Sequence, residues 1–124
     1  MVIVALICAA LAALVHVYIF WLESLAFMTT GRKAFGVGAE DAAVMRPWAF
    51  NQGFYNLFLA IGVVAGLGLR GPNPDAGTAV IVFALASMLT AALVLIGSDR
   101  SKARGAVVQG LFPALALVFL ALSL

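Results

Sequence analysis

Residues 2–28 read VIVALICAALAALVHVYIFWLESLAFM and are apolar almost throughout. About 20 apolar residues suffice for a helix to cross the roughly 30 Å hydrocarbon core of a bilayer. Three more apolar stretches follow, at residues 48–69, 78–97 and 106–124. We therefore predict an all-α integral membrane protein, a four-helix antiparallel bundle that forms a single transmembrane domain over residues 1–124.

The composition supports a membrane protein and excludes several other classes. Hydrophobic residues make up 65% of the chain and charged residues 10%, against about 25% charged residues in soluble domains. The seven Lys and Arg residues lie between the apolar stretches, so their pattern reports topology and gives no indication of nucleic-acid binding. With Cys8 as the single cysteine and His16 as the single histidine, we predict no metal site, and no cofactor is indicated.

The distribution of cations predicts how the chain is oriented. The cytoplasmic loops of membrane proteins carry an excess of Lys and Arg. Six cations lie in the first and third loops, and one lies in the second: Arg32, Lys33, Arg46, Arg100, Lys102 and Arg104 against Arg70. We expect a multi-pass protein of the bacterial inner membrane with loops one and three in the cytoplasm and both termini in the periplasm.

The first apolar stretch contains two ionisable residues, His16 and Glu23. A charged side chain at the bilayer centre costs at least about 2.5 kcal/mol, so such groups usually face the bundle interior and have a function there. In a continuous α-helix, seven residues place the two side chains on one face, roughly 10 Å apart along the axis. Two interpretations stay open. Either these two residues are the candidate proton-transferring, or catalytic, pair, or His16 is a hydrogen-bonded core residue and Glu23 is a solvated helix end near Arg32 and Lys33.

A second group of polar residues opens the second apolar stretch, and one amide lies in the fourth. On the predicted topology these residues occupy the same cytoplasmic half of the membrane as Glu23, as do Ser87 and Thr90. The candidate binding residues are Asn51, Gln52, Tyr55, Asn56 and Gln109. Because unpaired polar groups are costly in hydrocarbon, we expect either a ligand pocket or an interhelical hydrogen-bond network that clamps the bundle.

Several local signals bear on the helix ends and contacts. Pro47 suits the first turn of the second helix, and residues 38–46 form either a short interfacial helix or an ordinary connector. Gly62 and Gly66, four residues apart, allow close helix approach.

Two motifs resemble those of a known family. They are HVYIFWLE at residues 16–23 and NQGFYNLFLA at residues 51–60. Together they resemble the paired signature of an uncharacterised family of small bacterial integral membrane proteins, domain of unknown function 1304. The resemblance covers essentially the whole chain. It implies a four-helix protein of the bacterial inner membrane and carries no established activity.

Three functions remain open from the residues alone. The first is binding and proton-coupled movement of a small lipophilic or cationic compound, with Glu23 exchanging a proton for the substrate. This would require a homodimer, because four short helices enclose little volume. The second is a membrane-embedded acid–base enzyme that acts on a lipid-soluble substrate through Glu23 and His16. The third is a non-catalytic subunit of a larger membrane complex, whose partners would include the lipid bilayer.

Overall fold

The computed structural model describes all 124 residues, which form helices and short connections without a β-strand. The predicted all-α class is therefore confirmed. In chain order the elements are α1 (Val2–Phe20), two π-helical turns η1 (Trp21–Leu25) and η2 (Phe27–Gly31), α2 (Arg32–Ala34), α3 (Ala39–Leu69), α4 (Pro74–Ser98), a 3₁₀ turn η3 (Arg100–Lys102) and α5 (Ala103–Leu122).

Four helical segments are long and apolar enough to cross a membrane. They are Val2–Leu25, Ala39–Leu69, Pro74–Ser98 and Arg100–Leu122, with 24, 31, 25 and 23 residues. Each exceeds the roughly 20 residues that a spanning helix needs. These segments correspond one to one with the four apolar stretches of the sequence.

Helix α4 begins four residues before the predicted start at residue 78, because its first turn is capped. Asn73 is the N-cap residue, and its side-chain oxygen accepts the backbone N–H of Ala76 at 3.1 Å. Pro74 occupies the first helical position, where its missing N–H is no loss.

Helix α3 also begins earlier than predicted, at Ala39 and not at residue 48. Glu40 and Asp41 lie in its first turn, where negative charge stabilises a helix N-terminus. The predicted place of Pro47 in a first turn was therefore wrong, because Pro47 lies inside the helix. At about 1.5 Å per residue, 31 residues reach about 46 Å, so α3 is longer than the hydrocarbon core is thick.

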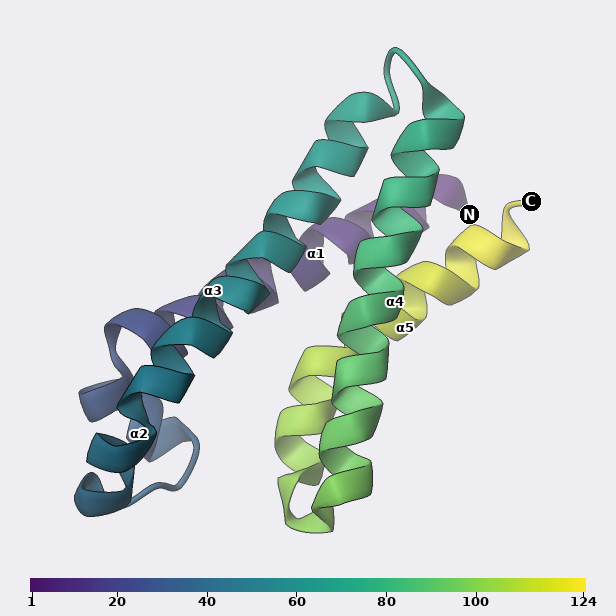
Figure 1. Cartoon of the computed structure of the whole chain (residues 1–124). Helices are drawn as coiled ribbons and strands as arrows, with labels where there is room; N and C mark the ends of the chain where they lie inside the picture. The colour runs from purple at the N-terminus through teal and green to yellow at the C-terminus, as the bar shows by residue number, and fades with distance from the viewer.

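The four long helices pack as an antiparallel bundle. Helix α1 packs against α3 and α5, and α4 packs against the same two helices. Both termini and the α3–α4 connection lie towards one end of the bundle, whereas the α1–α3 and α4–α5 connections lie towards the other (Figure 1). We call these the terminus end and the loop end.

The terminus end holds the apolar core, and α3 and α4 pack closely there. The core draws on the first half of α1, the last part of α3, the first half of α4 and the last part of α5: Ala5, Cys8, Ala9, Ala12, Ala13, Ala60, Val63, Ile81, Ala84, Leu85, Met88, Ala116 and Leu120. A Cβ atom on Gly66 would lie 2.6 Å from Ile81 Cγ1 and 3.0 Å from the Gly77 carbonyl oxygen. Gly66 therefore allows the backbones of α3 and α4 to approach closely.

At the loop end α3 and α4 diverge, as Figure 1 shows. The chain after α1 remains attached to α3 there, because Ser24 donates its hydroxyl to the Phe50 carbonyl at 2.7 Å. Gly53 permits this contact, since a side chain there would overlap Ser24. A small apolar cluster of Phe27, Ala42 and Ala49 adds to the attachment.

The first helix is not continuous over residues 2–28 as predicted. It is α-helical to Phe20 and then forms two π-helical turns, closed by bonds from Ala26 N–H to the Trp21 carbonyl (2.8 Å) and from Gly31 N–H to the Ala26 carbonyl (2.7 Å). Bonds that span five residues widen the turn. Gly31 is required there, because a Cβ atom would overlap the carbonyl oxygen of Leu22.

Candidate functional site

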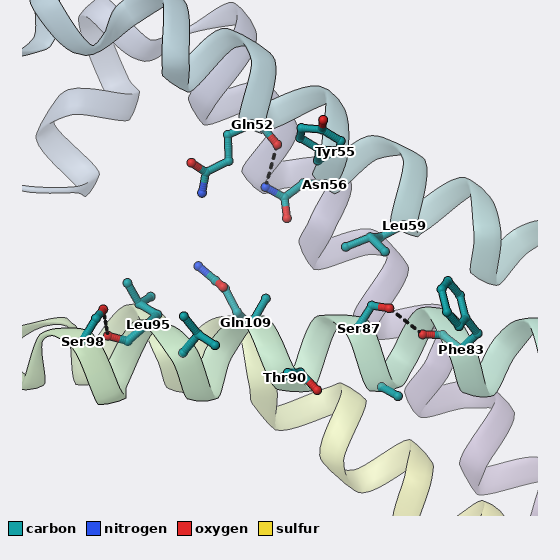
Figure 2. A pocket seen from close by; sticks show the side chains of 13 residues that line it. Gln52, Tyr55, Asn56, Leu59, Phe83, Ser87, Thr90, Leu95, Ser98 and Gln109 are labelled. Atoms are coloured by element: carbon teal, nitrogen blue, oxygen red, sulfur yellow. Dashed lines mark hydrogen bonds between the residues drawn. The ribbon is translucent and has the colours of Figure 1, made fainter.

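A groove of about 700 Å³ lies between the diverging parts of α3 and α4, with one residue contributed by α5. Figure 2 shows the side chains that line it. Seven of the 13 lining residues have hydrogen-bonding side chains, and six do not. The first set is Gln52, Tyr55, Asn56, Ser87, Thr90, Ser98 and Gln109, and the second is Leu59, Phe83, Ala86, Ala91, Val94 and Leu95.

Four of the candidate binding residues line this groove: Gln52, Tyr55, Asn56 and Gln109. The side chains of Gln52 and Asn56 point into it from α3, and that of Gln109 points towards them from the opposite side (Figure 2). Asn51 is exposed and does not line the groove. A helix turns by about 100° per residue, so adjacent amides on α3 face different directions.

Glu23 lies behind the groove wall. Glu23 is 8% exposed and belongs to the π-helical turn η1, which packs against α3. Asn56 Nδ2 donates to Glu23 Oε1 at 2.6 Å and to the backbone carbonyl of Gln52 at 3.2 Å. Asn56 thus connects the buried carboxyl group to the groove.

His16 is also buried, at 2% exposure, but it does not line the groove. Its Nδ1 atom lies 2.8 Å from the carbonyl oxygen of Ala12, one turn earlier in α1. Because a carbonyl oxygen only accepts hydrogen bonds, Nδ1 carries a proton. The π-helical turn η1 begins at Trp21 and contains Glu23, so the spacing of His16 and Glu23 no longer corresponds to two regular α-helical turns. No hydrogen bond joins them.

Ser98 also lines the groove, although it follows the third apolar stretch predicted at residues 78–97 and is not among the candidate binding residues. It is the last residue of α4. Ser87, Thr90, Val94 and Ser98 recur at spacings of three and four residues, which places them on one helix face. That periodicity is the signal that could have identified Ser98.

The groove carries no metal-binding constellation. No group of three or more His, Cys, Asp or Glu side chains that could hold a metal ion occurs in the chain. Cys8 belongs to the apolar core of the terminus end. The lining of the groove carries amides and hydroxyls, and the carboxyl group of Glu23 is linked to it through Asn56.

Four apolar helices of spanning length, packed as an antiparallel bundle, are compatible with a multi-pass membrane protein. The chain belongs to the family described as "Protein of unknown function (DUF1304)", which it matches over residues 10–121. The family resemblance inferred from the two motifs is thereby confirmed. All the groove residues lie within the matched region. No curated protein and no solved structure matches the chain.

Proposed function

We propose that this protein binds a small lipophilic or cationic compound in the α3–α4 groove and moves it across the membrane in exchange for a proton carried by Glu23. The observation that carries the proposal is the Asn56 hydrogen bond, which links the buried carboxyl group to a groove lined by amides and hydroxyls.

The volume and lining of the groove support ligand binding. Small-molecule sites are usually clefts of about 300–1,000 Å³ with a few convergent polar groups on a largely apolar wall, and this groove has about 700 Å³. Polar side chains within membrane-spanning segments are costly unless they find partners. Helices α3 and α4 diverge here instead of closing over these side chains, so a ligand can supply the missing partners.

Glu23 is the group best suited to carry a proton. Of the five acidic residues in the chain, it is the buried one. Buried ionisable residues within membrane spans commonly belong to proton or ion pathways. Because Glu23 reaches the groove through a single amide, a change in its protonation state alters the site that a ligand contacts.

The proposal places the protein in the bacterial inner membrane, with the loop end in the cytoplasm and both termini in the periplasm. Four of the seven Lys and Arg residues lie in the two connections of the loop end, and Arg46 and Arg104 lie near the starts of α3 and α5 at the same end. This distribution agrees with the positive-inside bias. The groove then lies in the cytoplasmic half of the bilayer, and a second copy of the chain would cover its open side in a homodimer.

The position of His16 favours movement of a compound over acid–base catalysis. A catalytic pair must reach one substrate, and His16 lies outside the groove lining.

Uptake of ethidium into proteoliposomes that contain DNA tests the proposal, because ethidium fluorescence reports entry. We expect uptake driven by a pH gradient with the wild-type protein and with Glu40→Gln, since Glu40 is exposed at the start of α3. Glu23→Gln should abolish the dependence on the pH gradient. Equal uptake with protein-free liposomes, or an unchanged response of Glu23→Gln, would contradict the proposal.

A further inference from the structure

Three of the seven polar side chains of the groove present only an acceptor to a ligand. The Ser87 hydroxyl donates to the Phe83 carbonyl at 2.8 Å, and the Ser98 hydroxyl donates to the Leu95 carbonyl at 2.9 Å. Both bonds stay within α4 and are drawn in Figure 2. A hydroxyl has a single hydrogen, so each of these oxygens can only accept a further hydrogen bond.

The hydrogen bonds of Asn56 also fix the orientation of its amide group, so that it presents an acceptor to the groove. Both of its hydrogen-bond contacts, Glu23 Oε1 and the Gln52 carbonyl, are oxygen atoms, so Nδ2 must face them and Oδ1 must face away. Oδ1 points into the groove in Figure 2. Asn56, Ser87 and Ser98 therefore each offer an oxygen acceptor to a ligand, because their own N–H or O–H groups already donate to partners within the protein.

The charged residues around the groove also favour a cationic ligand. None of its lining residues is Lys, Arg or His. The acidic residue Glu23 accepts a hydrogen bond from Asn56 and is one amide group removed from the groove. A compound that contacts Asn56 Oδ1 is therefore close to a carboxylate and to no cationic lining residue.

We propose that the groove selects amphipathic cations that carry N–H donors, such as primary alkylammonium compounds, over quaternary ammonium compounds of the same chain length. A primary ammonium group has three donors for these acceptors, whereas a quaternary group has none. This inference rests on the proposed function and names the ligand class of the same groove.

Protonation of Glu23 provides the release step. The carboxyl hydroxyl needs an acceptor, and rotation of the Asn56 amide by half a turn offers Oδ1 to it. The same rotation breaks the contact with the Gln52 carbonyl and turns Nδ2 into the groove. A bound cation then loses an acceptor and the nearby negative charge together. One proton bound replaces one cation released, so charge is conserved.

No other titratable group pairs with the Glu23 carboxylate by a hydrogen bond. Element η1 packs against α1, η2 and α3, and η2 holds no titratable side chain. The titratable side chains on α1 and α3 are Cys8, His16, Tyr18, Glu40, Asp41, Arg46 and Tyr55. Tyr18 is the nearest of these to Glu23 along α1, and its exposed ring stacks on Trp21. His16 lies two residues earlier, and its Nδ1 atom is engaged by Ala12.

Binding of radiolabelled dodecylammonium and dodecyltrimethylammonium to the full chain in lipid nanodiscs tests the selectivity, after subtraction of binding to empty nanodiscs. At a pH where Glu23 is ionised, we expect the primary amine to bind about tenfold or more tightly, the effect of one hydrogen bond to a charged group. Asn56→Leu should remove this preference. Asn51→Leu, the same change at an exposed amide outside the groove, should retain it.

Glu23→Gln serves as a second variant that keeps an acceptor for Asn56 Nδ2. The preference for the primary amine should persist in this variant and become independent of pH between about 5 and 9. Equal affinity of the two probes for the wild-type protein, or a preference that survives Asn56→Leu, would overturn the ligand class. Equal affinities that both fall in Gln52→Leu would leave the groove as a binding site, whereas binding of neither probe, with ethidium uptake also absent, would remove the proposed function itself.

Discussion

The contact between Asn56 and Glu23 should appear as a measurable coupling free energy. The perturbation is a double-mutant cycle of Asn56→Leu, Glu23→Leu and the double variant. Side-chain hydrogen bonds in membrane proteins average about 0.6 kcal/mol and reach about 1.7, whereas bonds to charged groups in soluble proteins contribute about 1.5–3. Because the bond is 2.6 Å long and Glu23 is 8% exposed, we expect the top of the membrane range, about 1.5 kcal/mol.

The losses in the free energy of unfolding of the two single variants should sum to more than the loss in the double variant. Asn56→Leu leaves the buried carboxyl group without its side-chain donor, and an unpaired buried polar group costs about 1–3 kcal/mol. The double variant replaces both partners by apolar groups and avoids that cost. Unfolding in mixed micelles with increasing dodecyl sulfate, followed by the fluorescence of Trp21 and Trp48, gives the four free energies of unfolding.

A control cycle combines Asn51→Leu with Glu23→Leu. Asn51 makes no hydrogen bond to Glu23, so the two effects should add to within about 0.5 kcal/mol. A coupling free energy for the Asn56 cycle no larger than that of the control would mean that the amide contributes nothing specific to the burial of Glu23, contrary to this prediction.

Two further predictions concern the contacts that hold the helices. Gly66→Ala should lower the free energy of unfolding by about 1–3 kcal/mol, because its Cβ atom would overlap Ile81; Gly62→Ala, whose Cβ atom meets its nearest neighbour at 3.5 Å, should raise it by up to about 1 kcal/mol. A loss at both glycines in the same micellar unfolding assay would contradict this assignment. Ser24→Ala should cost about 1 kcal/mol, because it removes the bond to the Phe50 carbonyl, and it should speed amide hydrogen exchange in η1. Unchanged exchange there would show that η1 is held by other contacts.

The four apolar stretches predicted the number and kind of the helices because that pattern depends only on residue type and on the thickness of the bilayer. Their ends were harder to predict. The start of α3 at Ala39 depends on an acidic first turn and on packing of Ala42 with Phe27. The π-helical turns depend on contacts such as that of Ser24 with Phe50, to which no local sequence signal points.

The candidate site was predicted in part. The sequence placed Gln52, Tyr55, Asn56 and Gln109 in one half of the membrane, and the structure brings these four to one groove. The sequence did not show which of the neighbouring amides, Asn51 or Gln52, would face the groove, since the direction of each side chain depends on the rotation of α3 about its axis. It also gave no indication that His16 would lie outside the groove.

Residue types along the chain were enough to predict four apolar helices and a group of polar residues in one half of them, because both depend on the cost of exposing polar groups to hydrocarbon. The link from Glu23 through Asn56 to a groove, and the two serine hydroxyls whose hydrogens are already bonded within α4, became clear only from the folded arrangement. Helix rotation and register are set by contacts between helices, such as Gly66 against Ile81. Those contacts join residues far apart in the chain, which a pattern along one helix does not encode.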